Sequence, residues 1–158
     1  MIKALRVDER LIHGQVATVW VNSLGCNRII VANNEAVKSE MQISALKIAC
    51  PTGVKLSILS LAKAALNIKS GKYDNEKVFL ICKTIADCKF LIDEGVEIKE
   101  FNVGNLSHKE GQTKIKKSVS LSDQDITDIK ELLDRGITIT AQMIPNESSA
   151  SISTFLPN

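Results

Sequence analysis

The sequence predicts an α/β fold: an open, doubly wound and mostly parallel sheet of about six to seven strands, with helices on both faces. Short apolar runs alternate along the chain with segments of helical periodicity. Several runs, such as IIVA and VFLIC, are almost continuously apolar, which is typical of strands buried on both faces of a parallel sheet. A chain of 158 residues has the size of one domain, so we expect a single domain over residues 1–158.

Seven segments are expected to form strands, because each is a short apolar run between turn or helix signals. They are Ile2–Val7, Arg28–Ala32, Val54–Ser60, Lys77–Cys82, Ile98–Val103, a weak segment at Lys116–Leu121, and Ile137–Ile144. Between them, Asn102–Lys117 is expected to be the longest functional loop. The Ser-rich tail Asn146–Asn158 either packs as a short closing segment or frays.

Five helices are expected, and each ends at a glycine or proline that terminates helices. The first three are Gly14–Leu24 before Gly25, Glu35–Cys50 before Pro51, and Leu61–Lys69 before Gly71. The fourth follows Thr84, a good N-cap, and ends at Gly95. The last runs from Ser122 to Gly136, with Asp125 in a position like that of a capping box.

Composition excludes several functional classes. The net charge is only +2 and aromatic residues make up 4% of the chain, which argues against a nucleic-acid-binding protein. The longest apolar run is far shorter than the roughly 20 residues that cross a bilayer, and the charged N-terminus lacks a signal-peptide core. The four cysteines form no CxxC pair, so we expect reduced, buried thiols in a cytoplasmic protein, with no metal site and no cofactor.

The segment with the clearest chemistry is the first junction between a strand and a helix. In open α/β sheets, ligands bind beyond the carboxyl ends of the strands. There His13 offers an imidazole nucleophile, Gly14 and Gln15 open the helix with free amides for an anion, and Arg10 can hold two phosphoryl oxygens. Asp8 is expected to orient Arg10 or to fix the tautomer of His13 through the ring nitrogen that does not react. This combination favours phosphoryl chemistry.

Other residues have plainer interpretations. Lys83 and Thr84 end the fourth strand and can face the same rim as His13, with Thr84 either orienting the site or capping the helix. His108 is expected to be a solvated loop residue, and Trp20 to belong to the core. A basic run is either a solvated loop or a surface that complements an acidic partner, namely Lys109, Lys114, Lys116 and Lys117.

The residues alone leave three functions open. The first is a carrier that accepts and releases a phosphoryl group, for which a shallow, solvent-facing loop is best suited because two large partners must reach the imidazole. The second is a hydrolase with a transient phosphohistidine, although His108 is the only candidate for the second histidine of such enzymes. The third is a non-catalytic regulator whose His13 loop binds an anion or a sugar phosphate.

Residues 6–16, RVDERLIHGQV, resemble the signature of the IIB subunit of the mannose/fructose/sorbose family of the bacterial phosphotransferase system. The segments CPTGVKLSILS, FNVGNLSHKEGQTKIKKSVSLS and GITITAQMIP are also similar to that family in order and spacing, so the resemblance covers nearly the whole chain. It implies an open α/β fold with a mostly parallel sheet. It also implies that His13 accepts a phosphoryl group on Nδ1 from a IIA phosphohistidine, with Arg10 on the phosphate.

The same resemblance implies that the group passes to a sugar held by membrane IIC and IID partners, and that the protein is cytoplasmic and peripherally associated with this permease. One stretch departs from the family pattern. The family usually carries acidic residues after the second strand, whereas this chain has Asn33 and Asn34. Asparagine keeps the ability to form turns and caps but brings no negative charge.

Overall fold

The computed structural model describes residues 1–157. Its strands are β1 (Ile2–Asp8), β2 (Arg28–Ala32), β3 (Lys55–Leu59), β4 (Val78–Cys82), β5 (Glu100–Asn105), β6 (Thr113–Lys116), β7 (Val119–Leu121) and β8 (Thr138–Ala141). Its α-helices are α1 (Gly14–Leu24), α2 (Glu40–Ala49), α3 (Leu61–Lys69), α4 (Ile85–Asp93) and α5 (Asp123–Asp134). Two short 3₁₀ helices, η1 (Ala36–Lys38) and η2 (Ile152–Phe155), complete the secondary structure.

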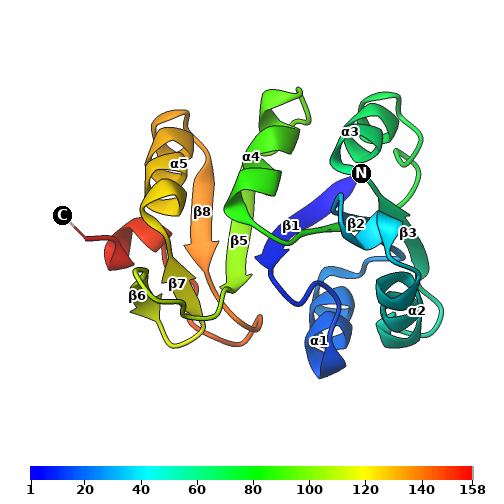
Figure 1. The fold of residues 1–158 in the computed structure, drawn as a ribbon. Helices are drawn as coiled ribbons and strands as arrows, with labels where there is room; N and C mark the ends of the chain where they lie inside the picture. Colours follow the sequence, from blue (N-terminus) through cyan, green and yellow to red (C-terminus); the bar gives the residue numbers. More distant parts are fainter. Residues whose placement is uncertain (158) are drawn as a thin grey trace.

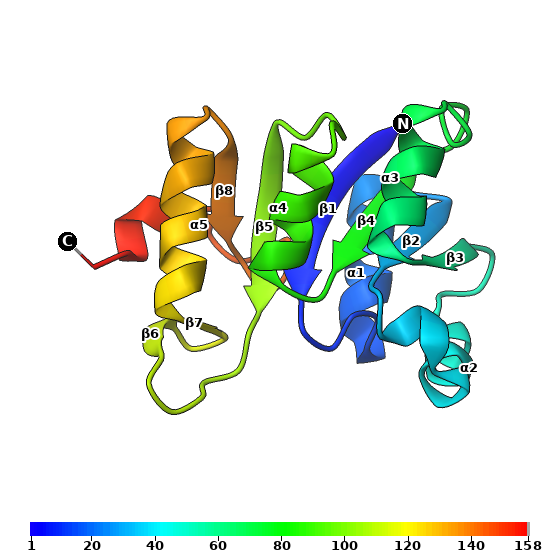
Figure 2. The same ribbon diagram turned by 45° about the horizontal axis from the view of Figure 1, so that its top comes forward.

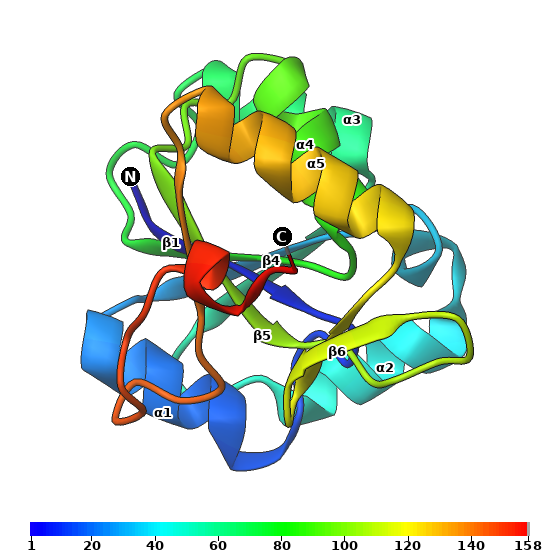
Figure 3. The same ribbon diagram turned by 90° about the vertical axis from the view of Figure 1, so that its left-hand side faces the viewer.

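Six strands form one parallel sheet in the order β3-β2-β4-β1-β5-β8 (Figure 1). Helices α3, α4 and α5 lie side by side across one face, and α1 and α2 cover the other (Figures 2 and 3). The predicted doubly wound α/β class is therefore confirmed. Because the helices that follow β1 and β4 leave toward opposite faces, the carboxyl ends of these neighbouring strands open a crevice between them.

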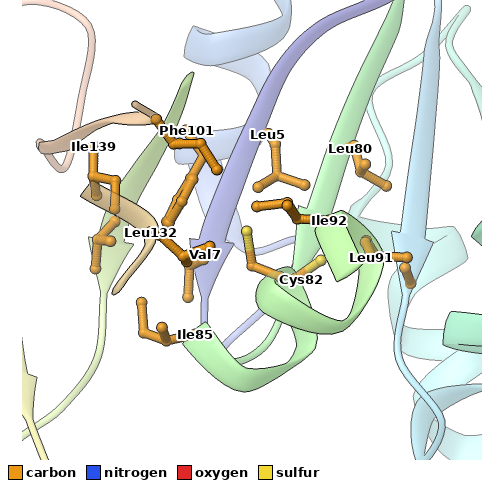
Figure 4. Close-up of a cluster of buried hydrophobic side chains, with 14 of the residues drawn as sticks. Leu5, Val7, Leu80, Cys82, Ile85, Leu91, Ile92, Phe101, Leu132 and Ile139 are labelled. Carbon is orange, nitrogen blue, oxygen red and sulfur yellow. The ribbon is translucent and has the colours of Figure 1, made fainter. Parts of the chain in front are cut away.

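Apolar side chains fill both layers between sheet and helices. The larger cluster joins the sheet to α3, α4 and α5 and includes Leu5, Leu80, Leu91 and Phe101 (Figure 4). The smaller cluster joins the other face to α1 and α2, and Trp20 belongs to it, as expected. The continuous apolar run of β4, VFLIC, is buried at every position, as a central strand requires.

Two elements differ from the sequence prediction. The weak strand at Lys116–Leu121 is not part of the six-stranded sheet: its residues 119–121 form β7, which pairs with β6 as an antiparallel hairpin and touches the main sheet through a bridge from Val119 to Leu106 after β5. β6 lies within the expected long loop and β7 follows it. The expected helix Glu35–Cys50 is broken into η1 and α2. Ser39 has an extended backbone and its hydroxyl accepts from the Gln42 amide, so it starts a new helix.

The C-terminal tail packs rather than frays within the described residues. Ser151 bridges to Thr140 of β8, and Ile152 of η2 is fully buried in the larger core cluster. Asn158, the last residue of the expected tail, lies outside the described residues. Within residues 1–157, no helix combines the length and the apolar character needed to cross a membrane.

Candidate functional site

Two buried side chains hold the loop between β1 and α1 against the core. Leu11 and Ile12 are buried in the cluster under α1 and α2, although they sit in a loop. Leu11 has a left-handed backbone with φ of 58°, a conformation that costs about 1–3 kcal/mol for a residue other than glycine. Its burial and the hydrogen bond from its amide to the Asp8 carbonyl hold it there. The backbone just before His13 is therefore held in a defined conformation.

His13 is hydrogen-bonded to the carboxylate at the end of β1. Its Nε2 lies 2.9 Å from Asp8 Oδ2, and Asp8 is completely buried. Every other contact of this carboxylate comes from an N–H donor, so the carboxylate acts as acceptor and Nε2 as donor. The unprotonated nitrogen of a neutral His13 ring is then Nδ1. This contact is the one that the second expected role of Asp8, fixing the tautomer of His13, requires.

Four further N–H groups converge on Asp8. Arg6 donates through Nε at 3.2 Å and Nη2 at 3.1 Å to Oδ2. The backbone amide of Arg10 donates to Oδ1 at 2.9 Å, and Asn105 Nδ2 reaches the same oxygen at 3.4 Å. Burial lowers the pKa of Arg6 from its usual value, and the neighbouring Asp8 opposes that shift. Arg6, Arg10 and Asn105 thus hold the carboxylate in place, in addition to its contact with His13.

The imidazole is more covered than a shallow, solvent-facing loop implies, because only 10% of the His13 side chain is exposed. Its Nδ1 has no hydrogen-bond partner within residues 1–157. In that part of the chain, Asn67 Nδ2 is the one side-chain nitrogen or oxygen that is buried and has no hydrogen-bond partner. Because His13 Nδ1 also has no partner, it would belong to that group if it were buried. It is therefore accessible to solvent. The ring is buried on the side that Asp8 holds and open at the nitrogen that can react.

The start of α1 is free of side-chain caps. His13 occupies the N-cap position without a side-chain cap hydrogen bond, and the first turn carries no acidic residue. Gly14 has a φ of 46°, which favours glycine, and a Cβ there would meet no atom within 4 Å. Gly14 and Gln15 are both exposed. Their amides can therefore bind oxygen atoms of an anion placed next to Nδ1.

Arg10 and Thr84 take different positions in the structure. Arg10 is exposed, and its guanidinium has no hydrogen bond or ion pair with residues 1–157, so only its backbone is oriented by Asp8. The Thr84 hydroxyl accepts from the Asp87 amide at 3.0 Å and caps α4. It makes no hydrogen bond to His13 or Asp8 in the described chain. The capping role expected of Thr84 is the one that the structure shows.

Part of the basic run faces the rim near the His13 loop. A pocket of about 230 Å³ lies there, and Lys83 and Thr84, which follow β4, line it together with Glu9, Ser107 and Lys109. Lys116 is different from its neighbours, because it is half-buried and pairs with Glu147 at 3.0 Å. His108 is exposed but bonds to Ser120 through Nδ1 at 2.8 Å. A hollow of about 890 Å³ lies at the opposite end of the sheet, beside the amino ends of β1, β4 and β5.

Asn33 and Asn34 act as caps and as a neutral partner. Asn33 Oδ1 accepts from the Ala36 amide, and Asn34 Oδ1 accepts from the Leu61 amide at the start of α3. Asn33 Nδ2 donates to Asp87 at 3.3 Å. Burial raises the pKa of Asp87 above its usual value, and this hydrogen bond partly opposes the shift. The turn and capping abilities expected of the two asparagines are both used.

Sequence reasoning missed Arg6 and Asn105. Arg6 is 2% exposed and lies within β1, where a charged residue gives no sign of whether it snorkels or pairs. Its spacing from Asp8 was a usable signal, since residues two apart on a strand point to the same face. Asn105 comes from β5 and is far away in the sequence, so only the strand order brings it to Asp8.

Groups of His, Cys, Asp and Glu that could hold a metal ion are absent from residues 1–157. Cys26, Cys82 and Cys88 are buried and Cys50 is half-buried, all as free thiols. Burial raises the pKa of each thiol, which keeps them protonated at neutral pH. The chemistry that the site offers is that of one imidazole nitrogen beside a helix start.

Comparison with known proteins shows the family of this chain. The family model described as "PTS system sorbose subfamily IIB component" matches residues 2–158. The sorbose-specific EIIB component of Lacticaseibacillus casei is 35% identical over 152 residues, 96% of this chain and 93% of that protein. The mannose-specific EIIAB component of Escherichia coli K12 is 33% identical over 147 residues, which are 93% of this chain and 46% of the relative.

A solved structure is similar over almost the same range. The crystal structure of the IIBSor domain of the sorbose permease from Klebsiella pneumoniae matches with a TM-score of 0.91 and 33% identity, covering 96% of this chain and 93% of that one. The molecule is thus an open parallel α/β protein with a histidine at the start of its first helix. The comparisons show that this chain belongs to the sorbose-subfamily IIB components of the sugar phosphotransferase system, which are phosphotransferases of sugar uptake.

Proposed function

We propose that this protein carries the phosphoryl group on Nδ1 of His13. The observation that carries the proposal is the 2.9 Å contact between His13 Nε2 and Asp8, which leaves Nδ1 unprotonated at the uncapped start of α1. Arg10, Gly14 and Gln15 are the groups that hold the phosphoryl oxygens. Arg10 is exposed and free of partners within residues 1–157, so its side chain can turn toward an arriving phosphate.

In the transfer step, the Nδ1 lone pair attacks the phosphorus of the donor's phosphohistidine. The new N–P bond forms as the donor's N–P bond breaks, and the donor ring keeps the electron pair. The proton on Nε2 stays between His13 and Asp8, so no proton has to leave the site. The amides of α1 and the Arg10 guanidinium stabilise the charge on the equatorial oxygens, which is the main task of a protein in phosphoryl transfer.

The partners follow from the same proposal. A IIA phosphocarrier donates the group, and a sugar held by a membrane IIC/IID permease receives it. The mannose-specific relative is named EIIAB and this chain matches about half of it, which supports a IIA partner for a B component. The protein works as a single carrier domain over residues 1–158 in the cytoplasm, peripherally associated with the permease. Two exposed basic residues near the rim, Arg10 and Lys109, suit an acidic IIA surface, whereas Lys83 is only partly exposed.

The test is transfer of radioactive phosphate from phosphoenolpyruvate through the general phosphotransferase proteins and a IIA protein. The wild-type protein and a His108→Ala variant are expected to be labelled, and a His13→Ala variant is expected to remain unlabelled. His108 is the matched control because it is the only other histidine of the chain. Labelling of His13→Ala at the wild-type level would overturn the assignment.

The same assay separates the two other functions. A hydrolase predicts steady release of phosphate from small phosphate esters with no partner protein. A regulator predicts stabilisation of the protein by a sugar phosphate, without covalent label. Stable label that is chased onto a sugar by permease-containing membranes supports the carrier and excludes both.

Arg10 can be tested with a conservative change. Arg10→Lys keeps the positive charge but loses the fork that binds two oxygens, so labelling is expected to slow about tenfold or more. Arg135→Lys changes another exposed arginine far from the loop and is expected to label at the wild-type rate. Equal rates for the two variants would remove Arg10 from the phosphate-binding group.

A further inference from the structure

Arg6 is a buried cation that contacts three parts of the protein around the site. Two of its nitrogens donate to Asp8, and Nη1 donates to the Gln142 carbonyl at 3.0 Å. Its guanidinium carbon lies 5.3 Å from the ring centroid of Trp20, which belongs to α1, the helix that His13 begins. Arg6 therefore links β1, α1 and the segment after β8.

The space for this guanidinium is made by a glycine. A Cβ on Gly104 would lie 2.0 Å from Arg6 Cζ and 2.1 and 2.2 Å from its two terminal nitrogens. The pairing of β1 with β5 also shifts register here, passing from Val7 with Val103 to Asp8 with Asn105. A glycine inside a strand often marks such an irregularity or a close approach, and Gly104 marks both.

The segment after β8 is itself clamped where it meets Arg6. Trp20 Nε1 donates to the Met143 carbonyl at 3.0 Å, and Asn102 Nδ2 donates to the Gln142 carbonyl at 2.9 Å. Glu147 accepts from the Met143 amide and from Lys116. The carbonyl that receives Arg6 is thus fixed independently of Arg6, and it holds the guanidinium in one orientation toward Asp8.

We propose that Arg6 is a positioning residue for phosphoryl transfer at His13, acting through Asp8, and that Gly104 provides the space it needs. The guanidinium fixes Asp8 so that this carboxylate accepts from His13 Nε2, and the ring then keeps Nδ1 unprotonated and aimed at the donor. The proposal rests on the proposed function of His13. Its first readout, the tautomer of the unphosphorylated ring, does not depend on that function.

The tautomer is measured by ¹⁵N NMR of histidine-labelled protein in a His108→Ala background, where one imidazole reports. In the parent protein the Nε2–H form is expected to dominate. Arg6→Lys keeps the charge but loses the fork, and Gly104→Ala keeps Arg6 but displaces its guanidinium. Both are expected to raise the population of the Nδ1–H form and to slow labelling from the IIA donor about tenfold to hundredfold, the range for residues that orient a reacting ligand.

Arg28→Lys is the matched control. Arg28 also pairs with a carboxylate and lies over an aromatic ring, but at the amino end of the parallel strands, away from His13, and its change is expected to leave tautomer and rate unaltered. The role of Arg6 is overturned if Arg6→Lys and Gly104→Ala keep the parent tautomer, if the tautomer changes without loss of rate, or if Arg28→Lys gives the same losses. Absence of label on the parent protein itself would instead overturn the function of His13.

Discussion

Two arginines of this protein have almost the same surroundings, toward opposite ends of the parallel strands. Arg6 pairs with Asp8 near the carboxyl end of β1 and lies 5.3 Å from the ring of Trp20. Arg28 pairs with Glu76 at the beginning of β2 and lies 5.2 Å from the ring of Tyr73. The difference is burial: the side chains of the first pair are 2% and 0% exposed, and those of the second are 16% and 21% exposed.

Burial changes what an ion pair does. Water near Arg28 and Glu76 can replace a lost partner, so this pair contributes little to stability and fastens the start of β2 to the turn before β4. Asp8 is closed off from solvent, so the N–H donors around it must stabilise its negative charge. These donors also fix the orientation of the carboxylate, and the carboxylate in turn orients the ring of His13. The guanidinium of Arg28 therefore joins two segments of the chain, whereas that of Arg6 belongs to the hydrogen-bond network of His13.

The largest expected effect is a difference between two identical substitutions. Arg6→Met leaves a buried carboxylate without its ion-pair partner, which is expected to lower the free energy of unfolding by about 3–5 kcal/mol. Arg28→Met is expected to cost at most about 1 kcal/mol, because its carboxylate is hydrated. Urea unfolding of both variants measures the difference. Equal losses would mean that burial does not distinguish the two pairs.

The next effect concerns the space beside Arg6. Gly104→Ala is expected to destabilise the protein by about 1–3 kcal/mol, since its Cβ would overlap the guanidinium. In an Arg6→Met background the cost should shrink, because a flexible thioether can move aside. A double-mutant cycle measures the coupling. If alanine costs the same in both backgrounds, the glycine is required by the backbone of β5 and not by Arg6.

Much of this fold follows from local sequence signals, and the part that does not has a physical reason. The bounds of α1 and α3 match their prediction, because both helices end before a glycine or a short turn. Ser39 was overlooked as a new helix start, so η1 and α2 were joined into one expected helix. β7 lies within the weak strand expected at Lys116–Leu121, but β6 was not expected, because the four residues TKIK are too short to show a clear period.

The site divides in the same way. Asp8, His13 and Gly14 lie within seven residues of one another, so the sequence alone indicates that they meet at the start of α1. Asn105, Gly104 and the Gln142 carbonyl could not be predicted, since they reach the site through strand order and a register shift. Contacts between distant segments carry no local signature in a single sequence.

The smallest expected effect tests the exposed pair by pH. The hydrogen bond from Arg28 lowers the pKa of Glu76 below its ordinary value of 4.5, with further help from the charges of Arg28 and Lys55 and against the effect of burial. A carboxyl group with a lowered pKa in the folded state stabilises the protein above its unfolded pKa, and this contribution is lost as pH falls through the folded value. Glu76→Gln should therefore lower the free energy of unfolding by at most about 1 kcal/mol at pH 7, and the difference from wild type should disappear as pH falls from 4.5 through the lowered pKa of Glu76. Glu110→Gln, at an exposed glutamate without an ion pair in residues 1–157, should show no such dependence, and a difference for Glu76→Gln that persists unchanged into acid would show that the lost contact is not ionic.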